Sequence, residues 1–382
     1  MSALATPEHD TITVHLDNRT HDIVVSSGWL DRFGEILKSR VAERNVMVFT
    51  SPRIGALYYD ALERSLSAAG FQKIRRHDIP DGEQNKNLSE FANCCEALVQ
   101  HFPQSESAPL VVNLGGGVVG DMGGFVAATF LRSGVPYVQV PTTLLGCVDC
   151  GVGGKVGVNS KTVKNIIGRF YQPKLVFADL ELLRTLPPRE IRSGIAEVIK
   201  YGVVCDANLF EYLEENMEKL LALDREIIRH VAVECYRIKA RVVEADEEDN
   251  KGKRNVLNYG HTIGHALEMA ADLQMTHGEA ICVGMIAANQ IALRLGILDQ
   301  SSADRIRAVI QRAGLPVSAP AFEVSFDRLL ESMKHDKKFR EGKNLFVLPT
   351  GIGAWKPVRD VEMPFIAEAV KSCLQTSGIS AR

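Results

Sequence analysis

The chain has 382 residues, of which 46% are apolar and 24% are charged, the balance of an ordinary soluble globular protein. Its length exceeds what one hydrophobic core usually supports, so we expect two domains. The formal net charge of −3 gives no support for a nucleic-acid partner or a membrane surface, although positive charge can still gather around an anionic substrate.

Strand and helix patterns alternate in the first half of the chain. Residues 11–16 and 21–26 alternate apolar and polar side chains, as an antiparallel hairpin does. The segments that follow are strand 45–50, helix 56–69, strand 73–79, helix 88–101, strand 110–114, helix 118–131 and strand 137–140. This alternation predicts an α/β nucleotide-binding domain, with a mostly parallel, doubly wound sheet and helices on both faces.

Helical periods dominate from Pro187 onward. They cover residues 188–201, 207–223, 225–245, 261–273, 277–295, 302–313 and 326–335, and only residues 344–348 look like a late strand. We therefore expect an α/β domain over residues 1–183 and an all-helical domain over residues 184–382. A cleft between two such domains is a preferred place for a ligand site.

The sequence carries no sign of export. Its first ten residues lack a basic segment followed by an apolar one, and no apolar run approaches the ~18–20 residues that span a bilayer. The eight cysteines are scattered, and the pair Cys147 and Cys150 has no second pair with which to form a four-thiolate metal site. We expect a cytoplasmic protein with no membrane partner.

A glycine cluster, Gly115-Gly-Gly-Val-Val-Gly-Asp121, follows a predicted strand and opens a helix. Backbone N–H groups at a helix N-terminus bind pyrophosphate well, so the cluster is a candidate nucleotide site. The acidic residue that a dinucleotide fingerprint carries about twenty residues further on is missing, because Tyr137-Val-Gln-Val140 stands there. Taken alone, the cluster also fits a plain tight turn.

Three histidines, His261, His265 and His277, fall close together in the second half. His261 and His265 are four residues apart and share one face of a helix, which suits a divalent metal. Spacing alone favours these two as ligands, with buried, hydrogen-bonded histidines as the alternative. Nearby, Lys200 lies in an apolar helical segment where its ammonium requires a partner. Together with Lys155, Lys164 and Arg254, it indicates a pocket for an anion with more than one charge.

Together these segments resemble the 3-dehydroquinate synthases, within the wider sugar-phosphate cyclase family. The matching stretches run in family order from about residue 80 to residue 353. They are Pro80-Asp-Gly-Glu-Gln-Asn-Lys86, Gly115-Gly-Gly-Val-Val-Gly-Asp121, Gly124-Phe-Val-Ala-Ala-Thr-Phe-Leu-Arg132, Pro141-Thr-Thr-Leu-Leu145, Val152-Gly-Gly-Lys155, Lys164-Asn165, Phe170-Tyr-Gln-Pro173, Ala196-Glu-Val-Ile-Lys-Tyr-Gly202, residues 258–268, His277-Gly-Glu279 and Asp336-Lys-Lys338. The resemblance implies a phosphate-eliminating lyase that depends on NAD and zinc, with cobalt as an alternative metal.

The resemblance also assigns residues to these cofactors. NAD would be held by Glu83, Lys86, Gly115, Gly116, Gly117, Asp121, Thr142 and Thr143. The metal would be bound by Glu197, His261 and His277, which moves His265 to the substrate. Three protein ligands with open positions are what a catalytic zinc requires.

The remaining assignments concern the substrate, 3-deoxy-D-arabino-heptulosonate 7-phosphate. By the same resemblance, Asp149, Lys200, Lys239 and Asn165 would face its hydroxyls, and Lys164 and Arg254 its carboxylate. The phosphate would meet Lys155, Asn258, His265 and Lys337, with Arg132 reaching over from the other subunit of a homodimer. The implied reaction, a shikimate-pathway step, combines transient oxidation by NAD, phosphate elimination, re-reduction and aldol cyclisation to 3-dehydroquinate.

Three places depart from the family pattern. Cys150-Gly151 replaces two small hydroxyl residues, Ser51-Pro52 replaces an acidic ribose contact, and Lys155-Val-Gly-Val-Asn159 is equally similar to cyclases of sedoheptulose 7-phosphate. Arg254 keeps the dehydroquinate-type identity, and a guanidinium binds a carboxylate bidentately, which a neutral sugar end would not need. A sedoheptulose phosphate cyclase and a metal-dependent polyol dehydrogenase stay open as alternatives, the latter accumulating NADH. A non-catalytic binding module has little support, because the zinc and NAD sets are both complete.

Overall fold

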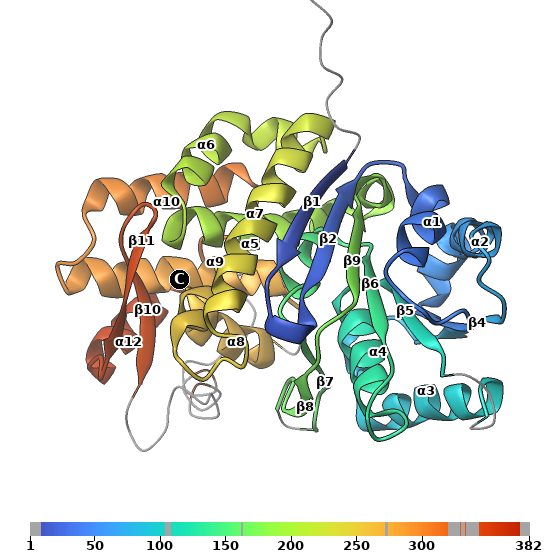
Figure 1. Ribbon diagram of the computed structural model, residues 1–382. Helices are drawn as coiled ribbons and strands as arrows, with labels where there is room; N and C mark the ends of the chain where they lie inside the picture. The colour runs from blue at the N-terminus through green and yellow to red at the C-terminus, as the bar shows by residue number, and fades with distance from the viewer. Residues whose placement is uncertain are drawn as a thin grey trace, which may run out of the picture. The chain divides into compact units, whose positions relative to one another are not determined.

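The computed structural model describes residues 9–103, 108–161, 163–271, 274–319, 329, 333 and 344–374 (Figure 1). The chain divides into two compact units. One contains Met1–Leu186 and Ile228–Glu248, and the other contains Pro187–Ile227 and Asp249–Arg382. Where the sequence suggested a single boundary near residue 183, the chain therefore returns once to the first unit, through most of one long helix.

A seven-stranded sheet forms the centre of the first unit, in the order β1-β2-β9-β6-β5-β3-β4. Its strands are β1 (His9–Val14), β2 (His21–Ser26), β3 (Val46–Thr50), β4 (Ile74–Asp78), β5 (Leu110–Gly115), β6 (Tyr137–Pro141) and β9 (Leu175–Asp179). The pair β1 and β2 is antiparallel, with His9 opposite Ser26, and the other neighbours are parallel. The predicted hairpin and the mostly parallel sheet are both confirmed.

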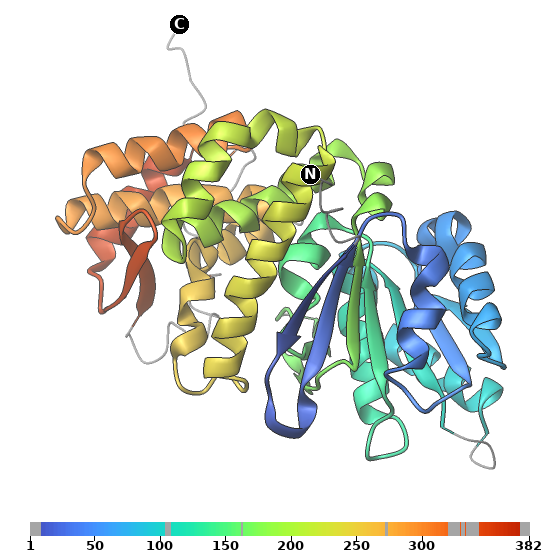
Figure 2. The ribbon, with the colours of Figure 1, turned by 45° about the horizontal axis from the view of Figure 1, so that its top comes forward.

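Helices cover both faces of this sheet (Figure 2). On one face α1 (Phe33–Lys38) and α2 (Pro52–Ala68) pack in a core with Val46 and Val48 of β3. On the other, α3 (Leu88–His101) and α4 (Gly117–Thr129) pack in a core with Met47 and Phe49. Successive side chains of a strand point to opposite faces, so a strand buried on both sides becomes a continuous apolar run.

Three further elements complete the first unit. The strands β7 (Lys155–Val158) and β8 (Ile167–Phe170) form a small antiparallel hairpin. The helix α7 (Arg225–Ala245) lies beside β1, where Nε of Arg229 is 2.7 Å from Oδ2 of Asp10. This ion pair ties the returning segment to the first unit. The sequence analysis did not anticipate β7, β8, β9 or α1, all of which are short.

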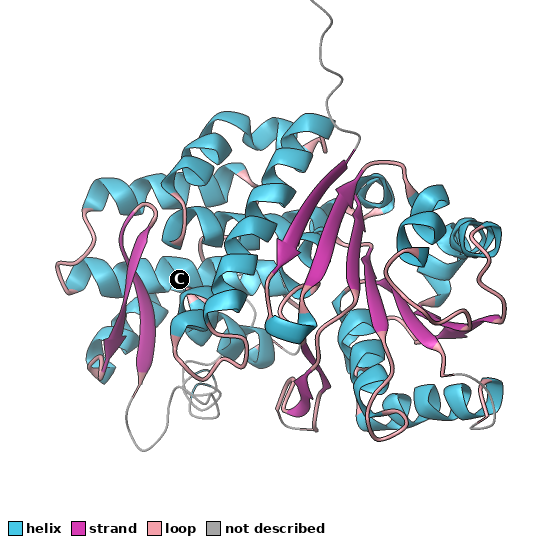
Figure 3. Ribbon diagram, in the orientation of Figure 1, coloured by secondary structure: helices cyan, strands magenta, loops and turns pink. Residues whose placement is uncertain are grey.

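Within the residues that the structure describes, the second unit is helical apart from one hairpin (Figure 3). Its helices are α5 (Pro188–Val204), α6 (Ala207–Leu221), the start of α7, α8 (His261–Ala270), α9 (His277–Arg294), α10 (Gln300–Arg312) and α12 (Met363–Cys373). The expectation of one late strand was wrong, because β10 (Leu345–Gly351) pairs with β11 (Ala354–Arg359). The second strand was hidden by its exposed, proline-containing sequence. The helix expected over residues 326–335 lies almost wholly outside the described residues.

The helices α8 and α9 pack with their backbones in contact, and this close approach positions the site described below. A Cβ atom added at Gly284 of α9 would lie 2.0 Å from the carbonyl oxygen of Gly260, at the start of α8. A Cβ atom at Gly278 would lie 2.3 Å from the backbone oxygen of Ser193 in α5. Only glycine permits these approaches, which bring the start of α8 against α9 and the first turn of α9 against α5. Among the described residues, no helix is long and apolar enough to cross a bilayer.

Candidate active site

Three side chains from three helices of the second unit converge on one point. Oε1 of Glu197 lies 3.5 Å from Nε2 of His261 and 3.4 Å from Nε2 of His277. One ligand atom from each residue lies within 4.8 Å of the other two. Glu197 is fully buried, and His261 is 8% exposed. One carboxylate oxygen and two imidazole nitrogens at this spacing suit a zinc ion that keeps an open position.

Both imidazole rings are oriented by a contact to Nδ1, the ring nitrogen that faces away from Glu197. Nδ1 of His261 lies 3.0 Å from the backbone oxygen of Tyr259, whose hydroxyl donates to Oδ1 of Asn289 at 2.6 Å. Nδ1 of His277 lies 3.5 Å from Oε2 of Glu268, which is 6% exposed. Each ring therefore presents Nε2 to Glu197, the arrangement that metal-ligating histidines usually adopt.

The electrostatics of this group favour a cation. Burial lowers the pKa of His277, but hydrogen bonds and charge from Glu197 and Glu268 outweigh it and raise that pKa to about 9. Lys200 forms a buried ion pair with Glu197 one turn along α5, which supplies the partner that its ammonium required. The two carboxylates that favour a positive charge on His277 also favour a metal ion at this position, which would bind in place of the proton.

The other predicted site residues of the second unit are placed as follows. His265 is exposed, and its ring centroid lies 5.1 Å from that of His261 and 5.8 Å from that of His277. Arg254 is 2% exposed, and it shares a short 3-10 helix, Lys253–Asn258, with Asn258 immediately before α8. Lys337 lies outside the described residues.

Glu268 was not expected from the sequence to be a site residue. Glu268 lies two helical turns after His261 on α8, a spacing that keeps both on one face. Replacing it by glutamine removes the charge that faces Nδ1 of His277, so we expect zinc affinity to fall about 10–100-fold. The dissociation constant is measured by competition with a chromophoric chelator. Glu214→Gln, which breaks only the surface pair with Arg305, should leave affinity unchanged, and an unaffected Glu268→Gln variant would contradict the assignment.

In the first unit, the glycine cluster lies at the carboxyl end of the sheet. Gly115 ends β5, and α4 begins at Gly117. A Cβ atom at Gly116 would lie 2.8 Å from Cγ2 of Thr143, and the Thr142 N–H donates to the oxygen of Gly115 at 3.0 Å. The turns that follow β5 and β6 therefore pack together and leave bare backbone at a helix N-terminus, a cradle that fits a pyrophosphate.

A polar network lies beside that cradle. Nζ of Lys86 lies 2.5 Å from Oδ2 of Asp121 and 2.5 Å from Oδ1 of Asn165. Burial disfavours the ammonium of Lys86, yet the charges of Asp121 and Glu83 outweigh it and raise its pKa. Asn159, which the sequence analysis missed as a site residue, donates to Glu83 at 2.8 Å and accepts from the N–H of Asn165 at 2.8 Å.

The other predicted residues of the first unit are placed as follows. Nζ of Lys239 in α7 donates to the backbone oxygen and to Oδ1 of Asp149, at 2.7 Å each, so this pair forms within the first unit. Lys164 lies 3.9 Å from Glu83. Lys155, at the start of β7, and Arg132, in a left-handed turn after α4, are both exposed.

Comparisons with known proteins agree with this geometry. The family model for the N-terminal part of 3-dehydroquinate synthase matches residues 76–193, and the model for its C-terminal part matches residues 194–339. The 3-dehydroquinate synthase of Desulforamulus reducens is 44% identical over 353 residues, which cover 92% of this chain and 97% of that protein. The chain belongs to the 3-dehydroquinate synthase family.

Solved structures extend the likeness to sister cyclases. The structure of 2-epi-5-epi-valiolone synthase from Streptomyces hygroscopicus subsp. jinggangensis 5008, with NAD+ and Zn2+ bound, is 28% identical with a TM-score of 0.84 and covers 94% of this chain and 98% of its own. A 2-deoxy-scyllo-inosose synthase complexed with carbaglucose-6-phosphate, NAD+ and Co2+ is 25% identical, also with a TM-score of 0.84, and covers 96% of this chain and 100% of its own. The family fold predicted from the sequence is confirmed.

Proposed function

We propose that the protein is a 3-dehydroquinate synthase that converts 3-deoxy-D-arabino-heptulosonate 7-phosphate into 3-dehydroquinate and phosphate. The observation that carries the proposal is the convergence of Glu197, His261 and His277 in a chain 44% identical to a 3-dehydroquinate synthase. NAD bound to the first unit would supply reversible hydride transfer, and zinc or cobalt held by the trio would supply Lewis acidity.

In the first unit, we assign NAD binding to the glycine cradle and its polar network. The cradle offers backbone N–H groups to the pyrophosphate, and Lys86 offers a charge that Asp121 and Asn165 hold in place. The residues assigned to NAD are Glu83, Lys86, Gly115, Gly116, Gly117, Asp121, Thr142 and Thr143. Asp149 and Lys239 form an ion pair. Together with Asn165, they are assigned to the substrate hydroxyls.

The charged ends of the substrate need cations. Arg254 and Lys164 are assigned to the carboxylate, because a guanidinium pairs with it bidentately. Lys155, Asn258, His265 and Lys337 are assigned to the phosphate, where positive charge stabilises the leaving anion. Lys200 keeps Glu197 oriented through their ion pair and is assigned to a substrate hydroxyl. We further propose a homodimer in the cytoplasm, with Arg132 completing the partner's phosphate site.

The functions assigned to these residues differ between the two parts of the chain. Residues 1–183 would hold NAD and contribute Asp149, Lys155, Lys164 and Asn165 to the substrate. Residues 184–382 would hold the metal ion and the other substrate contacts, with Lys239 contributed by the helix segment that returns to the first unit.

A comparison of two substrates tests the proposal against the sister cyclases. With NAD and zinc present, phosphate release is expected from the heptulosonate phosphate and not from sedoheptulose 7-phosphate, which lacks the carboxylate. Release from sedoheptulose 7-phosphate alone would move the protein to the other branch, for which the 28% identical valiolone synthase structure is the precedent. Binding specificity of this kind reflects buried charges left unpaired by the wrong substrate.

A further inference from the structure

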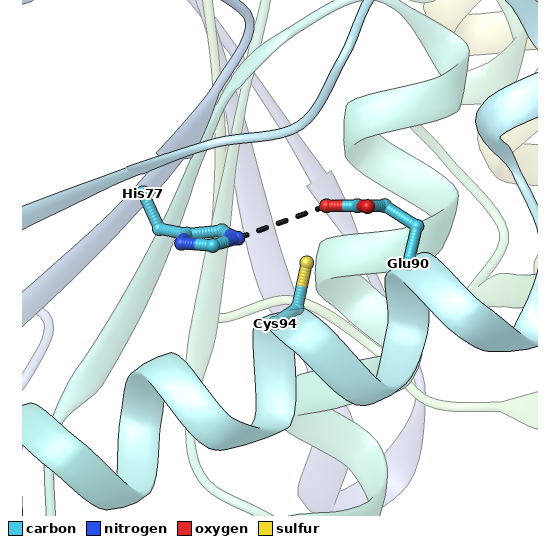
Figure 4. A group of neighbouring side chains, drawn as sticks. All are labelled: His77, Glu90 and Cys94. Carbon is cyan, nitrogen blue, oxygen red and sulfur yellow. Dashed lines mark ion pairs between the residues drawn. The ribbon is translucent and has the colours of Figure 1, made fainter.

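A second group of metal-binding side chains lies in the first unit, apart from the residues assigned above. His77 comes from β4, while Glu90 and Cys94 lie one helical turn apart on α3. Figure 4 shows the three side chains turned toward a common space. One ligand atom from each lies within 4.8 Å of the other two, the same limit that the Glu197 trio meets.

The spacing of these atoms fits an ion better than it fits direct hydrogen bonds. Nε2 of His77 and Oε1 of Glu90 are 3.8 Å apart, too far for a hydrogen bond. Nε2 of His77 is buried and has no hydrogen-bond partner within the part of the chain that the structure describes. Zinc bonds of about 2.0–2.3 Å at tetrahedral angles separate ligand atoms by roughly 3.3–3.6 Å. A slight shortening of the 3.8 Å distance between Nε2 of His77 and Oε1 of Glu90 would bring it close to that range.

Cys94 would supply the ligand that distinguishes this site. Its side chain is fully buried, and its sulfur lies 3.9 Å from Sδ of Met122. Burial and the neighbouring Glu90 carboxylate raise the pKa of the thiol, so it stays protonated until a metal ion displaces the proton. Binding forms one metal–sulfur bond and releases that proton to water. The side chains of His77 and Glu90 are 26% and 15% exposed, so the group lies close to solvent.

We propose that His77, Glu90 and Cys94 form a second divalent-metal site, which takes zinc or cobalt. A thiolate, an imidazole and a carboxylate select these borderline ions over magnesium or calcium, which prefer oxygen ligands. The strand β4 and the helix α3 are joined by the segment that contains Glu83 and Lys86. An ion shared by His77 and the first turns of α3 ties the two ends of that segment together, so its role is to hold the segment rather than to take part in the reaction.

Cobalt provides a spectroscopic test, because a cobalt–thiolate bond absorbs in the near ultraviolet and the Glu197 trio contains no sulfur. Titration of chelator-treated full-length protein with Co2+ is expected to give two bound ions per chain and a thiolate charge-transfer band. The variants Cys94→Ser and His77→Ala should each bind one ion and lose the band. Cys95→Ser, which changes the adjacent, partly buried cysteine of α3, is the matched control and should keep both.

The outcomes separate this site from the trio. A His261→Gln variant should lose one ion and keep the band, so failure of the proposed function would leave the second site intact. His77→Ala keeps the core sulfur, and a thermal melt of each metal-free variant shows that it is folded. One bound ion in the unaltered protein, or a band that survives Cys94→Ser, would overturn the proposal.

Discussion

Replacing His277 by glutamine is expected to lower phosphate release from the heptulosonate phosphate by about 10³-fold, while the affinity for NAD is kept. His277 supplies one of the three ligand atoms around Glu197, and a Lewis-acidic ion is worth several kcal/mol, about 1.4 kcal/mol for each factor of ten. The residues assigned to NAD all belong to the first unit, and His277 belongs to the second. Steady-state phosphate release and NAD titration measure the two effects separately.

The exposed His230 provides the matched control for this variant. His230→Gln should retain full activity and full zinc content. Glu197→Gln is a less clean test, because it leaves the buried ammonium of Lys200 without its carboxylate and threatens the fold. A His277→Gln enzyme that binds no zinc and yet releases phosphate at the normal rate would show that the reaction does not depend on the metal ion.

The second large effect is expected at Lys86 and Asp121. Asp121→Asn removes the carboxylate that pairs directly with the Lys86 ammonium, which is 4% exposed, so the free energy of unfolding should fall by about 3–5 kcal/mol. In the double variant Lys86→Met/Asp121→Leu, both charges are removed, so much of the lost free energy of unfolding should be regained. Its NAD affinity should nevertheless stay about 10–100-fold low, because a charge-assisted contact is missing. Urea unfolding and NAD titration give the two quantities.

A surface pair of the first unit is the control for this cycle. Glu234→Gln removes the partner of Arg237 on the exposed side of α7 and should leave both stability and NAD affinity unchanged. A double variant that recovers NAD affinity together with stability would show that Lys86 acts only in folding.

The regular parts of the fold were predictable because their patterns are local. The helix expected over residues 88–101 is α3, since its apolar period and its N-cap Asn87 lie within the segment itself. The strand β9 was missed because its five residues form a short apolar run, which periodicity alone does not distinguish from part of a buried helix. The hairpin partner β11 was missed because pairing with β10, not apolar alternation, makes it a strand.

The site was predictable in part for a similar reason. The spacing of His261 and His265 pointed to a helix face, but Glu197 enters the trio only because glycines let α5, α8 and α9 approach so closely. The family resemblance identified Glu197 as the third ligand, and no local pattern in the sequence identifies it. Asn159 was missed because its contact to Glu83 arises from packing between distant segments. Glu268 was missed because its contact to His277 depends on how α8 packs against α9.

A 3-dehydroquinate synthase returns NAD unchanged in every turnover, and the amount of product formed per NAD tests this directly. With zinc, excess heptulosonate phosphate and NAD far below the substrate concentration, 3-dehydroquinate and phosphate should form in equal amounts, many molecules for each NAD, without lasting absorbance from NADH. A reaction that stops after one product per NAD, with NADH accumulating, would contradict the account and indicate a dehydrogenase.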